Sequence, residues 1–198
     1  MPAIVALPWH DATAIPNEEF PMWHPVPRLA LALILGVAPL SGQTAPPDLS
    51  DAEVAHVAVT ANTIDIDLAK VAGTKATNDA VRKFAATMVT DHSAVNAQAA
   101  ALAGRLGVTP KDNAVSQGLT KGAVAARAAI EARRGAAFDR AYIDREVAYH
   151  QAVLDALDTV LIPTTSNPEL RKLLTDVRPA IAAHLEHAKV LQQTLAAR

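Results

Sequence analysis

Residues 138–161, which read FDRAYIDREVAYHQAVLDALDTVL, decide the fold of this chain. Apolar side chains recur here every three or four residues, which is the period of one face of an α-helix. The apolar seam consists of Ile143, Val147, His150, Leu154, Leu157 and Leu161. At its centre, where a leucine would be ordinary, stands His150. We therefore predict a long amphipathic helix, ended by Pro163, that turns one histidine toward the core.

Two further segments have the same apolar period, and each also carries a histidine in its seam. One covers residues 77–106 and contains His92; the other covers residues 167–195 and contains His184. Their apolar positions alternate in steps of four and three, which is the seam of helices packed in a bundle. Pro179 falls inside the last segment, so we expect that helix to be bent there or divided in two.

Another helix is expected over residues 51–72, where Ser50 and Glu53 form a capping box and Gly73 provides a stop. The segment 114–134 has a weaker helical pattern because it contains two glycines, each costing about 1 kcal/mol relative to alanine. We interpret it as a short helix that crosses one end of the bundle.

These elements predict an all-α protein. Four long helices with short first and last connections and a long central connection fit a ferritin-like four-helix bundle, here with a short extra helix in the crossover. We assign residues 48–198 to this single domain. The composition agrees, since 51% of the residues are hydrophobic, 4% are aromatic, and no segment alternates like a β-strand.

Residues 1–47 differ from the rest and are expected to be a leader. They hold nine of the 13 prolines, and within them Arg28 precedes the apolar run 29–40 and a tail of small residues. This pattern is typical of a cleavable signal peptide at about residues 22–45. Met22 fits such a peptide better as a start, which makes residues 1–21 a mis-assigned extension. We therefore expect a periplasmic or secreted protein.

The charge pattern limits the partners of the exported chain. Loss of residues 1–45 removes one basic and three acidic side chains and leaves the chain formally neutral. Without a basic field we expect no nucleic-acid partner, and no transmembrane helix is expected after the signal is removed. An envelope protein or a second copy of the chain remains as the expected partner. With no cysteine, disulfides and thiolate metal sites are excluded.

The three seam histidines are expected to lie at one level of the bundle. At 1.5 Å per residue, His150 and His184 lie about 20 and 25 Å from the loop between their helices. His92 is also close to the middle of its helix. Glu146, four residues before His150, lies on the same helix face and can hold the imidazole.

Two interpretations of this layer remain open. In the first, it binds a divalent metal ion, and imidazole with carboxylate donors suits Zn, Cu, Ni or Fe. The candidate ligands are His92, His150 and His184, with Asp65, Asp91, Glu146 or the Glu53/His56 pair as further donors. In the second, which we favour on the sequence, the histidines form a buried polar layer that fixes helix register.

Catalytic chemistry is not expected. A di-iron centre needs Glu-x-x-His on two helices, whereas the segments before His92 and His184 lack the glutamate and the one Glu-x-x-His, Glu53–His56, is explained by capping. No nucleophile elbow, phosphate loop or zincin motif is present. We therefore predict that the protein is not an enzyme.

Four stretches resemble a family of exported bacterial proteins of unknown function. They are IDIDLAKVA (64–72), VRKFAATMVTDHSAVN (81–96), GAAFDRAYIDREVAYHQ (135–151) and RPAIAAHLEHAKVL (178–191). Members are ferritin-like bundles, often labelled outer-membrane or periplasmic proteins, so the resemblance implies that fold and export but no reaction. It places Asp91, His92, Asp139, His150 and His184 at motif positions, and Asp65 where the family usually has Glu. The leading expectation is a non-catalytic structural or stress-associated envelope protein; the alternative is a divalent-metal-binding protein.

Overall fold

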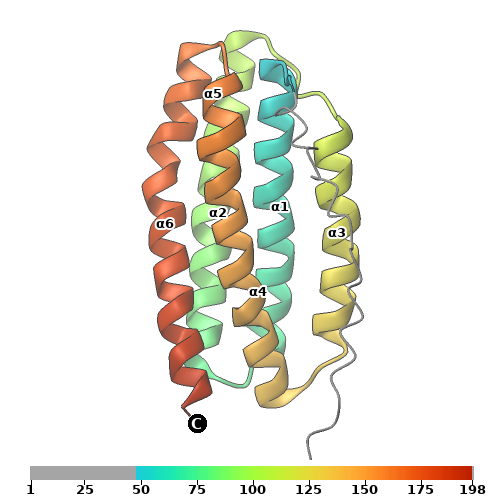
Figure 1. The fold of residues 1–198 in the computed structure, drawn as a ribbon, viewed down its shortest axis with the longest axis vertical. Helices are drawn as coiled ribbons and strands as arrows, with labels where there is room; N and C mark the ends of the chain where they lie inside the picture. The colour runs from blue at the N-terminus through green and yellow to red at the C-terminus, as the bar shows by residue number, and fades with distance from the viewer. Residues whose placement is uncertain (1–47, 198) are drawn as a thin grey trace, which may run out of the picture. The chain divides into compact units, whose positions relative to one another are not determined.

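The computed structural model describes residues 48–197, and all the regular structure within them is helical (Figure 1). The elements are α1 (Asp51–Lys75), α2 (Asp79–Leu106), α3 (Ala114–Glu131), α4 (Gly135–Ala156), the π-helix η1 (Leu157–Leu161), α5 (Ile162–Thr164) and α6 (Pro168–Ala196). The all-α prediction is therefore confirmed for this part of the chain. None of the helices in it is long and apolar enough to cross a membrane. The leader predicted for residues 1–47 lies outside the described residues.

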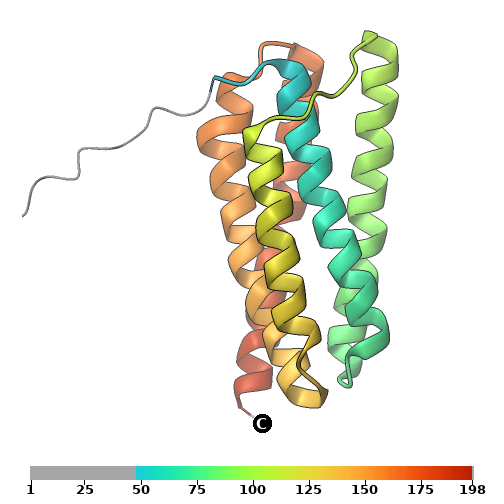
Figure 2. The same cartoon turned by 90° about the vertical axis from the view of Figure 1, so that its right-hand side faces the viewer.

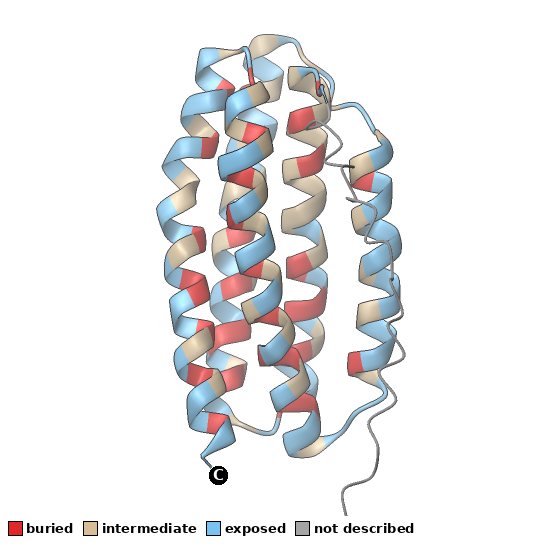
Figure 3. Cartoon of the chain, in the orientation of Figure 1, coloured by how far each residue is buried: buried red, intermediate tan, exposed pale blue. Residues whose placement is uncertain are grey.

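Four long helices form the bundle that carries the core. Helices α1 and α2 pack as one antiparallel pair, and α4 and α6 as a second pair, while α2 and α4 run in the same direction (Figures 1 and 2). Buried residues gather on the faces that these helices turn toward one another, and exposed residues cover the outside (Figure 3). The seams read from the sequence are thus the contact faces of the bundle.

The segment 114–134 was expected to cross one end of the bundle, but helix α3 does not do so. It runs along the outside against α1 (Figure 2), and only Ser116 and Ile130 of its residues are buried. The loop before it passes over the start of α1, where the Lys111 amide donates to the Ala52 carbonyl at 2.9 Å. The prediction was wrong because α2 and α4 run in the same direction, so the chain must return along the full bundle between them.

Two predicted helix ends also need correction, at Gly73 and at Pro163. Helix α1 continues past Gly73 to Lys75. The last segment, expected to be bent at Pro179 or divided in two, is one continuous helix, α6, with Pro179 inside it. The helix that contains residues 138–161 begins at Gly135, and Pro163 does not end it. It passes instead through the π-helix η1, whose wider turn changes the hydrogen-bond register just before the proline, which lacks an N–H donor.

The apolar core is divided into two clusters by the three seam histidines. The first cluster is built around Phe84, Phe138 and Tyr142, and the second around Val57, Leu154 and Leu174. In each of α2, α4 and α6, the seam leaves one cluster, passes its histidine and enters the other. A polar layer of three histidines therefore separates the two apolar clusters of the core.

Asp139 fixes the start of α2 from the facing end of α4. Its buried carboxylate accepts hydrogen bonds from the Thr77 amide (2.9 Å), the Thr77 hydroxyl (2.6 Å) and the Asn78 amide (3.0 Å). Asn78 in turn caps α2 by accepting from the Ala80 amide at 2.9 Å. Asp139, which the sequence analysis placed only among family motif positions, is thus a structural residue that joins two helices.

We predict that Asp139→Ala lowers the free energy of unfolding by about 2–4 kcal/mol, because three donors lose a charged acceptor in a buried position. Urea denaturation followed by circular dichroism measures the loss. Asp155→Ala, which removes an exposed carboxylate from the same helix, is the control and should change the stability by less than about 0.5 kcal/mol. Equal small effects in both variants would contradict the assigned role.

Candidate metal centre

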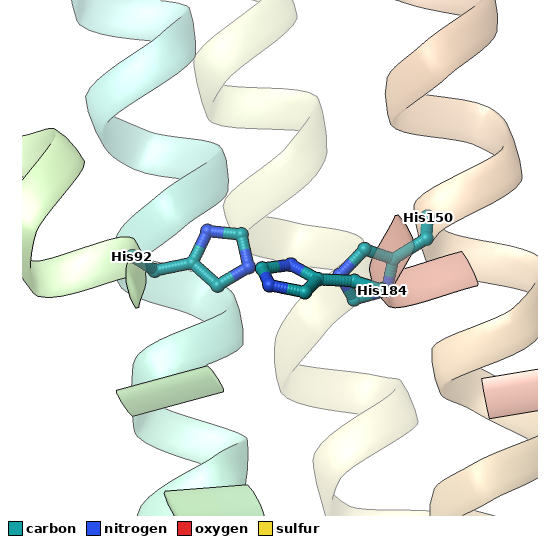
Figure 4. A group of neighbouring side chains, drawn as sticks. All are labelled: His92, His150 and His184. Atoms are coloured by element: carbon teal, nitrogen blue, oxygen red, sulfur yellow. The ribbon is translucent and has the colours of Figure 1, made fainter. Parts of the chain in front are cut away.

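Three imidazoles from three different helices meet at the middle of the bundle. His92 comes from α2, His150 from α4 and His184 from α6, and all three are buried. Their ring centroids lie 5.3–5.7 Å apart, and the rings point toward one another (Figure 4). The sequence prediction that these histidines share one level is confirmed.

Each ring uses its outer nitrogen in a hydrogen bond to an oxygen at the edge of the layer. The pairs are His92 Nδ1 with Asn62 Oδ1 (2.8 Å), His150 Nδ1 with the Glu146 carbonyl oxygen (2.9 Å) and His184 Nε2 with Asp91 Oδ2 (2.9 Å). These oxygens can only accept, so each outer nitrogen carries the proton. In the neutral rings of His150 and His184 the remaining, inner nitrogen therefore has a free lone pair, whereas His92 Nε2 faces the Asp65 carboxylate at 2.9 Å.

Among the described residues, the inner nitrogens of His150 and His184 have no hydrogen-bond partner, and that of His92 faces only the carboxylate of Asp65, at 2.9 Å. The three inner nitrogens are His92 Nε2, His150 Nε2 and His184 Nδ1, all fully buried. The three rings can offer ligand atoms that all lie within 4.8 Å of one another. Metal–nitrogen bonds of about 2.0 Å require nitrogens about 3.5 Å apart, so a small closure of the rings would suffice. The arrangement is that of a three-imidazole metal site with outer hydrogen bonds fixing each ring.

Two buried acids and an arginine lie next to the imidazoles. Asp65 Oδ2 lies 2.9 Å from His92 Nε2 and 3.8 Å from His150 Nε2. Arg145 Nη1 lies 2.7 Å from both Asp65 Oδ1 and Glu146 Oε1, so one guanidinium contacts two fully buried acids. The close approach of Asp65 to a nitrogen lone pair is favourable only with a proton or a metal ion between them.

The protonation of these groups follows from burial and charge. Burial lowers the pKa of His150 to about 4, and it also lowers the pKa of His184. Burial and the neighbouring Asp65 raise the pKa of Glu146 well above its usual value. For Asp65, burial acts to raise the pKa, but His92 and Arg145 outweigh it and hold the pKa well below its usual value. Asp65 therefore carries the negative charge, and His150 and His184 are neutral at pH 7.

The structure places the remaining candidate ligands in different roles. Asp65 and Glu146 border the layer, whereas Asp91 holds His184 from outside, through the nitrogen that points away from the centre. The Glu146 carboxylate is 3.4 Å from His150 Nδ1, and the closer contact of that nitrogen is the Glu146 main-chain oxygen.

Glu53 and His56 do not belong to the layer, so their suggestion as further ligands was wrong. Glu53 accepts from the Ser50 amide at the start of α1, and His56 lies 3.7 Å from Asp112. His187, three residues after His184, is exposed and packs edge-on against Phe84. Glu53 and His56 lie at the start of α1, with His56 about 14 Å along the helix before Asp65, and His187 lies on a face of α6 that does not point into the layer.

Sequence reasoning missed two residues that shape the layer. Asn62 sets the tautomer of His92, and its own amide nitrogen donates to Asn96 Oδ1 at 3.1 Å. Arg145 balances the charge of Asp65 and also donates to Glu146. The one available signal for Arg145 was a basic residue directly before Glu146, in a helix that also carried the seam histidine.

The fold and this site define an all-helical bundle with a buried histidine–carboxylate layer. Residues 37–191 match the family described as "Domain of unknown function (DUF4142)", and the chain belongs to that family. This agrees with the resemblance noted from the sequence. No curated protein matches the chain.

Solved structures with a similar fold include two of CopM. The first is CopM in the Cu(II)-bound form, at 17% sequence identity, and the second is CopM in the Ag-bound form obtained by co-crystallization, at 19%. Each has a TM-score of 0.56 and covers 74% of this chain and 97% of the CopM chain. At this identity the likeness shows the fold alone.

The low pKa of His150 predicts that the metal-free protein loses stability in acid. Between pH 6.5 and about 4 the unfolded chain takes up a proton on this histidine that the folded chain does not. Above pH 6.5 the titration of His150 does not lower the free energy of unfolding. As the pH falls toward 4, it lowers the free energy of unfolding by about 3 kcal/mol. Urea denaturation in the presence of a chelator, at several pH values, measures this slope.

His150→Leu isolates the contribution of that side chain, because the other titrating groups remain. Its unfolding free energy should depend less steeply on pH over this window than that of the wild type. His187→Ala, which changes an exposed histidine, should keep the wild-type slope. Identical slopes in the wild type and His150→Leu would show that His150 does not titrate in this way.

Proposed function

We propose that this protein binds one copper ion through His92, His150 and His184, and that it acts by binding the metal and not as an enzyme. One observation carries the proposal: three inner imidazole nitrogens are buried and converge, those of His150 and His184 have no hydrogen-bond partner in residues 48–197, and that of His92 has only the Asp65 carboxylate beside it. Buried polar atoms without partners are rare in proteins. A metal ion would satisfy all three at once.

The choice of copper rests on donor chemistry and on the structural likeness. Neutral imidazole is a good ligand for Cu, Zn, Ni and Fe, and Cu(II) binds most tightly among the divalent ions of this series. The similar fold of CopM has been solved with Cu(II) and with Ag bound, which supports a metal of this type here. Asp65 adds one carboxylate oxygen 2.9 Å from His92, while its other oxygen is paired with Arg145.

The alternative of a purely structural layer accounts less well for the contacts. A register-fixing layer is expected to join its polar groups to one another by hydrogen bonds. Here each histidine instead bonds outward, to Asn62, to the Glu146 carbonyl or to Asp91. Only His92 also has a partner inside the layer, Asp65, and the inner nitrogens of His150 and His184 are left for another group.

The signal-peptide pattern and the topology support a role in the cell envelope. The signal-peptide pattern of residues 22–45 and the formally neutral remainder motivate the proposal of a periplasmic or secreted protein. The long crossover between two antiparallel helix pairs supports the ferritin-like topology expected from the sequence. The absence of a second Glu-x-x-His motif supports binding over oxidation chemistry.

The test is a titration of the purified metal-free protein with Cu(II), followed by electron paramagnetic resonance (EPR) and by elemental analysis after gel filtration. We expect one ion per chain, with nitrogen ligands. His150→Leu and His184→Leu should each weaken binding by at least about a hundredfold, because each removes one of three ligands. His187→Ala is the matched control and should bind like the wild type.

Two results would overturn the proposal. One is a wild-type protein without stoichiometric copper and without a shift of its melting temperature on adding Cu(II). The other is unchanged binding in His150→Leu, which would place the metal elsewhere. Circular dichroism of each metal-free variant shows whether it is folded before the comparison is made.

A further inference from the structure

A second set of donors lies beside the three imidazoles. Asp65, Glu146 and His150 can also offer one ligand atom each within 4.8 Å of one another. Three of their atoms are buried, namely Asp65 Oδ2, Glu146 Oε2 and His150 Nε2, and of these only Asp65 Oδ2 has a close polar neighbour outside the set, His92 Nε2 at 2.9 Å. The layer therefore contains two overlapping donor sets, both buried and both incomplete without a further group.

The two sets differ in the metal that they suit. The imidazole set has three nitrogen donors, which favour copper, whereas the carboxylate set has two oxygen donors and one nitrogen, which move the preference toward Mn(II). His150 belongs to both sets. The sets are thus alternatives, and whichever ion draws His150 toward itself decides how the layer is used.

Arg145 lies on the carboxylate set. Its Nη1 is 2.7 Å from Asp65 Oδ1 and 2.7 Å from Glu146 Oε1, so it contacts one oxygen of each acid. The other oxygens face the histidines, with Asp65 Oδ2 2.9 Å from His92 Nε2 and Glu146 Oε2 3.4 Å from His150 Nδ1. The guanidinium also lies 3.7 Å from the centre of the Tyr149 ring. The Tyr149 hydroxyl donates to the Ala61 carbonyl at 2.9 Å, which fixes that ring.

These contacts hold a permanent positive charge next to the second donor set. Arginine does not lose its proton in proteins, and its side chain here is only 12% exposed. An ion bound to the acids would stand a few ångströms from the guanidinium in surroundings that screen charge poorly. The fixed charge therefore repels any divalent cation that binds at the acids. It repels much less a cation that lies nearer His92 and His184.

We propose that Arg145 determines the metal preference of the layer by acting as a built-in cation at Asp65 and Glu146. It excludes oxygen-preferring divalent ions such as Mn(II) from the carboxylate set and so leaves His150 to the imidazole set. This inference rests on the proposed function in its choice of native metal. In this role Arg145 does not need to contact the copper ion.

The experiment compares Mn(II) binding by the full chain in the wild type, Arg145→Met and Arg145→Lys, using the loss of the EPR signal of free Mn(II). Methionine keeps a long apolar stem without charge, and lysine keeps the charge. We expect no Mn(II) binding in the wild type or Arg145→Lys, and at least about a hundredfold gain of affinity in Arg145→Met. Arg140→Met removes an exposed arginine from the same helix and should leave Mn(II) unbound.

A merely structural Arg145 would change stability without creating Mn(II) affinity, so folded Arg145→Met without Mn(II) binding overturns the inference. Tight Mn(II) binding by the wild type also overturns it. Where Arg145→Met is unfolded without metal, Arg145→Gln, whose amide can still donate to an acid, is measured in the same way. If both are unfolded, recovery of helix on adding Mn(II) supports the inference, and no recovery contradicts it.

The outcomes separate this inference from the proposed function. A wild type that binds no Cu(II) overturns the proposed function. A gain of Mn(II) binding in Arg145→Met would still show that Arg145 prevents Mn(II) from binding at the two acids. A wild type that binds one Cu(II), together with an Arg145→Met variant that binds no Mn(II), leaves the proposed function standing and removes the inference.

Discussion

Two acidic side chains with no exposure to water can exist at the centre of this bundle because one arginine contacts both. Asp65 belongs to α1, and Glu146 belongs to α4 with Arg145 beside it. Burying an ion pair is expensive, and removing one partner of such a pair typically costs 3–5 kcal/mol. The contact therefore constrains how α1 and α4 can pack, and with them the height at which the histidines meet.

The outer hydrogen bonds complete this constraint for the imidazoles. A ring in a helical bundle can rotate about its side-chain bonds and carry its proton on either nitrogen. In this protein Asn62 and Asp91 hold two rings from neighbouring helices, and the third bonds to the backbone of its own helix. Orientation and tautomer are thus set before any ion arrives, which lowers the ordering cost of binding.

Much of this could be predicted from the sequence, for identifiable reasons. The helical period put His92, His150 and His184 into apolar seams, and depth along the helix placed them at one level. Asp65 and Glu146 were candidates for the same reason. Periodicity reports which face a residue is on, but not how far a long side chain reaches, so the contacts of Arg145 and Asn62 were not predicted. The path of α3 was missed because its position depends on where α4 must begin.

The division of the core has a consequence for the dynamics of the molecule. Apolar packing makes each half of the bundle cohesive, but the layer between the halves holds polar atoms that lack partners. Proteins open locally in units of this kind, and amide hydrogen exchange reports each unit separately. The metal-free layer is then a joint at which the two ends of the bundle can open one at a time. An ion that bonds to α2, α4 and α6 together would lock that joint and make the two ends exchange as one cooperative unit.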